Sequence, residues 1–337
     1  TTQGVNTFIP FAPVMVMLAM AMGLDSITGE AIMVLGGAIG FSTGTFNMFT
    51  TVVAQDIAEL PAYSGLWYRA VCFVVFYIVT NWYLIRYAKK IKKNPTMSPM
   101  FDLDQEMKAE EATMDLEAAS ELTGRMLAPL VLLVIAFAVI IYGAIVLKWG
   151  MAHMAAMFLT YSVVADLMIG TPVNTVCKDI LDGSKQMLGA AFIIGMATAI
   201  SGIMDAGKIT YTIVHATSEL LSGLPPIIIA PGMVLANTLI NLFLTSGSGQ
   251  AVAVMPILIP LADVLGVTRQ TTVLAFNFGD GFCNFILPTS TALMGTLSVT
   301  NIPYDRWMRF MWKLFLIWLV TGCVMTLIAQ MIHLGPM

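Results

Sequence analysis

Four short polar segments interrupt the apolar sequence of this 337-residue chain, and each combines glycine with Ser, Thr, Asn, Gln or Asp. They are Thr2–Thr7, Ser42–Asn47, Thr245–Gln250 and Gly279–Asn284. Glycine lets a backbone leave the helical conformation, and the freed peptide groups then need polar partners. A helix that begins at such a break offers N–H groups to a carboxylate, whereas one that ends there offers carbonyls to a cation. The segments therefore predict a site for a small charged molecule; ordinary loops or close helix contacts between small residues are the alternative.

Asp280 is the only ionisable residue in these four segments. An ionisable side chain among apolar segments is a functional candidate, because burying a charge is costly. Asp280 could hold the amino or guanidinium group of a substrate, bind Na⁺ or carry a coupled proton. The segments contain no Lys or Arg, so a dianionic substrate would depend on backbone dipoles alone. Backbone dipoles for one carboxylate and Asp280 for one cationic group would suit an amino acid, which we expect ahead of a dicarboxylate.

The composition places these segments in a membrane protein. The chain is 58% hydrophobic and 11% charged, whereas a soluble domain carries about 25% charged residues. Met126–Leu147 and Trp312–Ile332 are apolar runs long enough to cross a hydrocarbon core of about 30 Å. Uninterrupted runs of this length favour helices over the alternating strands of a barrel. We therefore predict an all-α polytopic protein of the lipid bilayer. The net charge of −4, without a basic cluster, argues against nucleic acid as a partner.

A polar segment divides the chain into two predicted membrane halves, 1–88 and 125–337. Residues 89–124 have a basic start and a strongly acidic middle, which predicts a solvent-exposed linker with a short amphipathic helix. We assume that residues 224–266 enter and leave the membrane on one side and that residues 269–298 form one interrupted crossing. Twelve of the 16 basic residues then lie on the same side of the membrane as the linker. The positive-inside rule then makes the linker cytoplasmic. The complete crossings in this arrangement lie near residues 63–86, 125–147, 151–170, 185–204 and 306–330, the last within a helix over 303–332.

The charge bias excludes a single span for residues 224–266 but does not separate a hairpin from two complete spans, and segment lengths favour the hairpin. Pro231–Thr245 has 15 residues and Gln250–Leu265 has 16, or about 22 Å and 24 Å of helix. Both are short for a crossing, and Pro256 and Pro260 are expected to interrupt the second. We therefore predict a re-entrant hairpin whose tip stops inside the bilayer.

An internal repeat relates the two halves. Residues 3–23 align without gaps on residues 246–266, which lie 243 positions later, and share two glycines and one proline with them. Further matches follow in the same order: "FSTGTFN" (41–47) with "FGDGFCN" (278–284), and "LPAYSGLWYR" (60–69) with "IPYDRWMR" (302–309). Three matched segments in the same order are much harder to attribute to chance than isolated Gly and Pro identities.

The two copies have opposite predicted orientations, because the charge count places Arg69 outside and its counterpart Arg309 inside. Inverted repeats with glycine-interrupted helices in corresponding positions indicate a secondary transporter. The first copy starts at the tip of its own predicted hairpin, and the chain has no initiator Met. We therefore expect the N-terminal part of the first repeat to lie outside this sequence.

Enzymatic chemistry is not expected. "GDG" at 279–281 and "YD" at 304–305 are similar to motifs of intramembrane aspartyl proteases. However, Asn277 stands where the GxGD motif needs its first glycine, and the two motifs come in reversed order. Motifs for zinc proteases, serine hydrolases and P-loop ATPases are absent. A channel remains an alternative to a carrier, because a hairpin-lined site can also form a pore.

Four stretches of the chain resemble one known family. They are "GFSTGTFNMFTTVVAQDIAELP" in the first half, and "INLFLTSGSGQAVAVMPILIPLADVLGVTRQ", "VLAFNFGDGFCNFILPTS" and "IPYDRWMRF" in the second. They resemble the YfcC-like membrane proteins, which belong with the anaerobic C4-dicarboxylate carriers of the DcuC type and the basic amino acid (arginine/ornithine) antiporters. All are placed in the ion-transporter superfamily. The likeness covers most of the chain apart from the linker.

This resemblance implies an inverted-repeat carrier with two re-entrant hairpins, interrupted transmembrane helices, a scaffold domain and a mobile transport domain. Such carriers are usually homodimers that work by an elevator-like motion. Carried over by position, and with Asn6 added from the first polar segment, the substrate-site candidates are Asn6, Thr45, Asn47, Ser246, Gly247, Ser248, Gly249, Gln250, Gly279, Asp280, Asn284, Pro288, Thr289 and Ser290. A Na⁺ site is expected near Asp280, Asn284 and Asn47.

We therefore expect a secondary active transporter, an antiporter or an ion-coupled symporter, in a bacterial cytoplasmic membrane. Its substrate is a small carboxylate-bearing metabolite, with arginine- or ornithine-like amino acids ahead of C4-dicarboxylates. No cofactor is expected beyond Na⁺ or H⁺ as the coupling ion. The sequence gives no stoichiometry or direction of transport.

Overall fold

The computed structural model describes Ile9 and residues 11–113, 151–185 and 225–335, together with scattered positions between 128 and 223. Regular structure in these residues is helical, without strands, which confirms the expected all-α class. The chain forms two compact units: one contains residues 1–101 and 190–337, the other residues 102–189. Three of the described helices are long and apolar enough to cross a membrane: Leu66–Lys93, Gly247–Leu265 and Tyr304–Met331.

The first unit contains two series of helices with the same order of elements. Each series has an arm, a second helix, an irregular stretch, a short helical segment and a 28-residue helix. The N-terminal series is α1 (Ala12–Ala21), α2 (Ser26–Ser42), η2 (Met48–Val52) with α3 (Val53–Ile57), and α4 (Leu66–Lys93). The C-terminal series is α12 (Gly247–Leu265), α13 (Arg269–Cys283), α14 (Thr291–Val299) and α15 (Tyr304–Met331), preceded by α11 (Pro226–Asn241).

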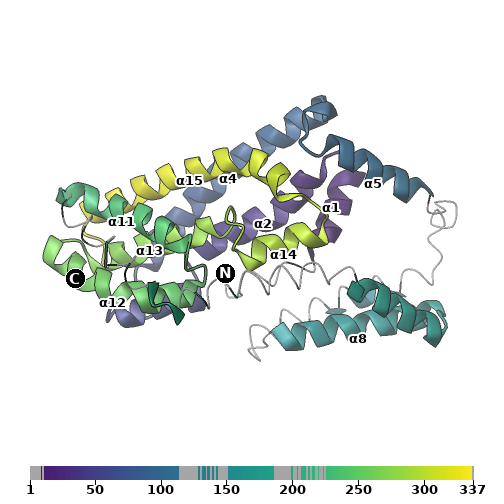
Figure 1. The fold of residues 1–337 in the computed structure, drawn as a ribbon, viewed down its shortest axis with the longest axis horizontal. Helices are drawn as coiled ribbons and strands as arrows, with labels where there is room; N and C mark the ends of the chain where they lie inside the picture. The colour runs from purple at the N-terminus through teal and green to yellow at the C-terminus, as the bar shows by residue number, and fades with distance from the viewer. Residues whose placement is uncertain are drawn as a thin grey trace. The chain divides into compact units, whose positions relative to one another are not determined.

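The turns that end the two arms also correspond. Gly23 follows α1 with φ of 78°, and Gly266 follows α12 with φ of 73°. This left-handed conformation is easy for glycine and strained for other residues, so both positions of the aligned sequence need glycine. The long helices α4 and α15 lie side by side (Figure 1) and contact each other.

Helix α13 is the centre of the first unit, and each of its residues from Gln270 to Cys283 is buried. It contacts α11, α12, α15 and α2. A Cβ added at Gly279 would lie 2.5 Å from Asn237 Cβ on α11, and one added at Gly281 would lie 2.5 Å from Ser42 Cα on α2. These glycines therefore let neighbouring helices approach α13 closely.

The interruption predicted at Gly279–Asn284 is wrong in position. Helix α13 continues to Cys283, and the irregular stretch runs from Asn284 to Ser290. Gly279 and Gly281 do not break the helix, because they remain helical and serve as contact points for α11 and α2.

The predicted limits of the hairpin arms also need correction. The helices span Pro226–Asn241 and Gly247–Leu265, and α12 continues through Pro256 and Pro260. A proline removes one helical hydrogen bond, but helices in apolar surroundings tolerate it where neighbours compensate. With 19 residues, α12 is long enough to span a membrane, so its length no longer favours a hairpin over a complete crossing.

The start of the predicted linker is exposed at residues 89, 90 and 92–97, and it is attached to the first unit at residues 98–100. Ser98 is buried, and its hydroxyl donates to Asp25 Oδ2 at 2.6 Å. The Tyr87 hydroxyl donates to the same oxygen at 2.6 Å, while Asp25 Oδ1 accepts from Thr28 N at 3.0 Å and caps α2. Arg306 of α15 donates to the Pro99 carbonyl. Beyond this point α5 (Phe101–Thr113) and α8 (Met151–Ile169) belong to the second unit.

The close contact at Gly279 gives a stability prediction. Gly279→Ala should lower the free energy of unfolding by about 1–3 kcal/mol, because the added methyl overpacks the α11 contact. Gly36→Ala is the matched control: nothing lies within 4 Å of a Cβ added there, so the loss of glycine flexibility should leave stability unchanged or slightly higher. Thermal unfolding in detergent measures both variants, and equal behaviour of the two would contradict this packing role.

Candidate functional site

The connection between α11 and α12 lies against the buried carboxylate of Asp280. Ser246 caps α12, with its Oγ accepting from Gly249 N at 3.3 Å. The next residue, Gly247, meets two other segments: an added Cβ would lie 2.9 Å from Asp280 Oδ2 and 2.5 Å from Thr50 Cγ2. A larger residue at this position would therefore displace either η2 or α13.

Amide side chains hold one oxygen of Asp280 and leave the other open. Asn241 Nδ2 donates to Asp280 Oδ1 at 2.8 Å and to Gln250 Oε1 at 2.8 Å. Gln250 Nε2 in turn donates to the Asn237 carbonyl at 3.1 Å and side-chain oxygen at 3.2 Å. Asp280 is fully buried, and its Oδ2 has no hydrogen-bond partner among the described residues. The open oxygen is the one beside Gly247.

A buried guanidinium approaches the same helix one turn earlier. Arg69, at the start of α4, is 1% exposed. Its Nη1 donates to Asn277 Oδ1 at 2.7 Å and to the Thr43 carbonyl at 3.4 Å, at the broken end of α2. Its Nη2 has no hydrogen-bond partner in the described part of the chain. The charge count from the sequence predicted that Arg69 lies on the outer side of the membrane. In the fold its side chain is enclosed by protein, because α4 begins beside the end of α2.

The two charged groups belong to one cluster. Asn277 and Asp280 are three residues apart on α13 and therefore lie on the same face. Thr50 joins them: its Oγ1 accepts from Asn277 Nδ2 at 3.2 Å, and its methyl group packs at Gly247. We call this set the polar cluster; its members are Thr50, Arg69, Asn241, Gly247, Gln250, Asn277 and Asp280.

Three of the expected site residues, Gly247, Gln250 and Asp280, lie in the polar cluster. Asn47 is buried, but its side chain is used by the backbone: Oδ1 accepts from Phe49 N and Thr50 N, and Nδ2 donates to the Phe41 carbonyl. It therefore shapes the start of η2 instead of offering a free oxygen to Na⁺. The hydroxyl of Thr45 is 3.2 Å from that of Thr43.

The remaining candidates lie around the cluster. Asn284 Nδ2 donates to the Asp280 carbonyl at 2.9 Å, and Ser290 caps α14 by accepting from Leu293 N at 3.4 Å. The Thr289 hydroxyl is buried without a partner among the described residues, whereas Pro288 is exposed. Ser246, Ser248 and Gly249 lie exposed or half-buried at the start of α12, and Gly279 packs on α11. Asn6 lies outside the described residues.

Sequence reasoning missed Arg69, Thr50, Asn237, Asn241 and Asn277. One signal was available: Asn237 and Asn241 are four residues apart in an otherwise apolar helix, so they share a face. Paired amides in an apolar helix need partners, and the fold supplies Gln250 and Asp280.

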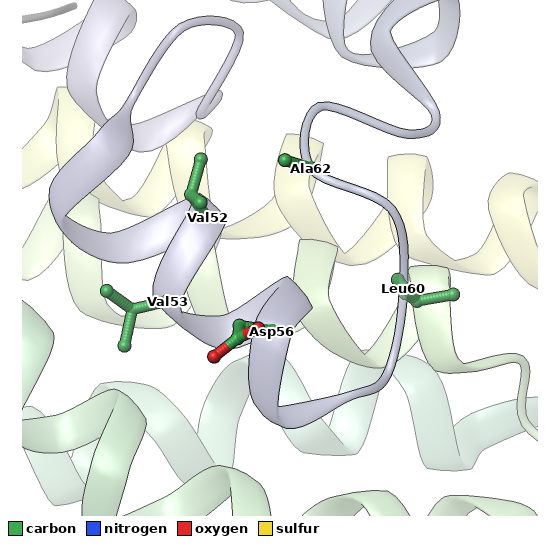
Figure 2. A pocket seen from close by; sticks show the side chains of 5 residues that line it. All are labelled: Val52, Val53, Asp56, Leu60 and Ala62. Carbon is green, nitrogen blue, oxygen red and sulfur yellow. The ribbon is translucent and has the colours of Figure 1, made fainter.

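A separate hollow lies beside α3. It has a volume of 190 Å³ and is lined by Val52, Val53, Asp56, Leu60 and Ala62. Figure 2 shows the first three on the helical segment and the other two on the stretch that follows it. It contains no member of the polar cluster and no candidate from the sequence, so it is not part of the site.

Comparison with known proteins gives matches over most of the chain. The family model "C4-dicarboxylate anaerobic carrier" (DcuC) matches residues 2–331. The Escherichia coli K12 protein named "Putative basic amino acid antiporter YfcC" is 34% identical over 312 residues, which cover 89% of this chain and 61% of that protein. An uncharacterized Haemophilus influenzae protein is 29% identical over 330 residues, which cover 97% of this chain and 65% of that protein. The chain thus spans less than two thirds of either relative, and no solved structure matches it.

The amide contacts of Asp280 give a second stability prediction. Asn241→Leu should cost about 1.5–3 kcal/mol of unfolding free energy, because a buried carboxylate loses its donor. Thr238→Val on the same helix is the control, since the Thr238 hydroxyl bonds only within α11, to the Val234 carbonyl at 2.8 Å. Unfolding in detergent should separate the two variants clearly. A leucine variant as stable as the valine variant would show that Asn241 does not support Asp280.

Proposed function

Because this chain belongs to the C4-dicarboxylate anaerobic carrier family, we propose that it works as a secondary active transporter of a small carboxylate-bearing metabolite. The polar cluster is the proposed substrate site. It combines polar groups from two broken-helix regions and one helix connection, as expected for a carrier that binds its substrate between repeats.

An amino acid with a cationic group, such as arginine or ornithine, is the proposed substrate. The observation that carries this choice is the pair of buried charges of opposite sign, each with one open atom: Arg69 Nη2 and Asp280 Oδ2. A guanidinium binds a carboxylate strongly, and a buried carboxylate binds an ammonium or guanidinium group. The carboxylate of an amino acid would pair with Arg69. Its ammonium group or its cationic side chain would pair with Asp280.

The alternative substrate is a C4-dicarboxylate, after the name of the family. A dianion would find one cation at Arg69, but its second carboxylate would meet Asp280, and like charges at close range are unfavourable. The name of the Escherichia coli relative supports an amino acid. The two descriptions therefore disagree, and the charges of the cluster favour the amino acid.

We also propose that the two series of helices are inverted repeats, each with a re-entrant hairpin, in a homodimer of a bacterial cytoplasmic membrane. The matching element order and the corresponding glycines after α1 and α12 support the repeat. An elevator-like motion of the broken helices against α4 and α15 would expose the polar cluster to either side. Residues 89–124 would lie in the cytoplasm, and Na⁺ or H⁺ would drive transport.

Counterflow in proteoliposomes tests the function and the role of Asp280 together. The protein should exchange labelled arginine for internal arginine or ornithine, and Asp280→Asn should weaken this exchange at least tenfold, because a desolvated charge contact is worth about 1.5–3 kcal/mol. Asp263→Asn is the control, since Asp263 lies half exposed and pairs with Arg269 at 2.8 Å. Exchange of succinate but not arginine would support the dicarboxylate alternative, and flux without trans-stimulation would indicate a channel.

Arg69 is tested with a substrate that lacks the carboxylate. Arg69→Gln should reduce the affinity for arginine at least tenfold and should have little effect on agmatine, its decarboxylated form, because only arginine offers an anion to the guanidinium. Arg269→Gln serves as the matched change, since that guanidinium already pairs with Glu59 and Asp263 at 2.8 Å each. Inhibition of arginine counterflow by each compound gives both affinities. An equal loss for arginine and agmatine would refute carboxylate binding at Arg69.

A further inference from the structure

A second buried carboxyl group lies outside the polar cluster. Glu30 of α2 is 0% exposed, and neither of its carboxyl oxygens has a hydrogen-bond partner among the described residues. Asp25, five positions earlier, is almost as buried, but Thr28, Tyr87 and Ser98 all donate to it. Glu30 therefore differs from Asp25, because no described group is held in hydrogen-bond geometry to its oxygens.

Two threonine hydroxyls that face Glu30 are also engaged within their own helix. The hydroxyl groups of Thr296 and Thr300 on α14 lie within reach of its carboxyl group. Both already donate their hydrogens to helix carbonyls: Thr296 Oγ1 to Leu293 at 2.9 Å, and Thr300 Oγ1 to Thr296 at 2.9 Å. Their oxygens keep free lone pairs. Each hydroxyl can donate to a carboxylate only by turning its hydrogen away from the helix carbonyl, whereas a carboxylic acid can donate to these lone pairs without breaking either bond.

Among the described residues, no cation compensates a charge on Glu30. The elements that pack against α2 are α1, α4, α13 and α14, and α1 and α14 contain no titratable residue. On α4, Arg69 donates to Asn277 and Thr43, and Tyr87 donates to Asp25. The other basic residues of α4 are exposed: Arg86, Lys89, Lys90, Lys92 and Lys93.

Helix α13 does not compensate Glu30 either. It carries Asp280, which is held by Asn241, and Arg269, which pairs with Glu59 and Asp263. Cys72 on α4 and Cys283 on α13 are buried thiols without positive charge. An isolated carboxylate in such a place costs several kcal/mol, and a bound proton removes that cost.

Glu30 also lies where the two helix series meet. Helix α2 precedes the break of the first series, and α14 follows the break of the second. If the series move relative to each other during transport, the contact between Glu30 and the two threonines must change. From these observations we propose that Glu30 is the proton-carrying group of the transporter. It takes one proton from water on one side of the membrane before α14 covers it, and releases that proton to water on the other side when the contact opens. This inference rests on the proposed transport function.

Glu30→Gln separates coupling from substrate binding. Glutamine has nearly the same shape as the protonated acid and stays neutral, so exchange of substrate across the membrane should continue. Accumulation of substrate driven by a pH gradient should fall at least tenfold. Glu30→Asp should restore part of this accumulation, and Glu106→Gln, an exposed carboxylate on α5, should behave as wild type. All four proteins are purified at full length and compared in the same proteoliposomes.

Thr296→Val provides a second measurement, which also decides the matter if Glu30→Gln cannot be purified folded. Removing the Thr296 hydroxyl takes away a hydrogen-bond donor that favours the charged form of Glu30, so the pH of half-maximal uptake should move higher by about half to one unit. Three results would overturn the proposal. They are undiminished pH-driven accumulation by Glu30→Gln, loss of exchange by folded Glu30→Gln, and an unchanged pH profile of Thr296→Val. So would accumulation driven by a Na⁺ gradient alone. Absence of exchange by the wild-type protein would instead refute transport itself.

Discussion

The structure depends on the complete burial of α13 and on the need of its polar side chains for partners. A helix enclosed on every side leaves no water to satisfy Asn277 and Asp280, so the surrounding elements must do so. Arg69 and Thr50 come from the first helix series, and Asn241 comes from α11. The bonds from Arg69 and Thr50 connect segments that are more than two hundred residues apart in the chain, and they fix how the two series face each other.

Glycine makes these bonds possible. At Gly279 and Gly281, α11 and α2 come close enough to α13 that any side chain would collide with them. Gly247 has the same effect at the connection between α11 and α12, which it brings against both Thr50 and Asp280. These glycines thus allow helices to pack closely in the described structure. The chain leaves the helical conformation after Cys283, about one turn later than the positions of Gly279 and Gly281 suggested.

The buried acids differ in what surrounds them, and this difference separates their proposed roles. Asp25 is fully supplied with donors and holds the start of the linker region against α2. Asp280 has one oxygen supplied and one open, which suits a site that waits for a cationic ligand. Glu30 has no hydrogen-bond partner and no cation beside it among the described residues, which suits a group that binds and releases a proton. Substrate and coupling ion would then be bound by different residues.

The sequence by itself determined the helical class and the family, because these depend on composition and on local motifs. It also predicted the internal repeat from matching segments, Asp280 from the cost of an isolated charge in an apolar segment, and Gly247 and Gln250 from the polar segment 245–250 and the family resemblance. It could not determine whether Gly279 breaks the helix or lets a neighbouring helix approach, since glycine permits both. Nor could it determine that α12 continues through Pro256 and Pro260. Only the tertiary structure decided that Arg69 is enclosed beside Asn277 and that Glu30 faces Thr296 and Thr300. Whether a distant charge is solvated or buried, and whether a hydroxyl still has a hydrogen to give, depends on contacts between segments far apart in the chain, and no local pattern records them.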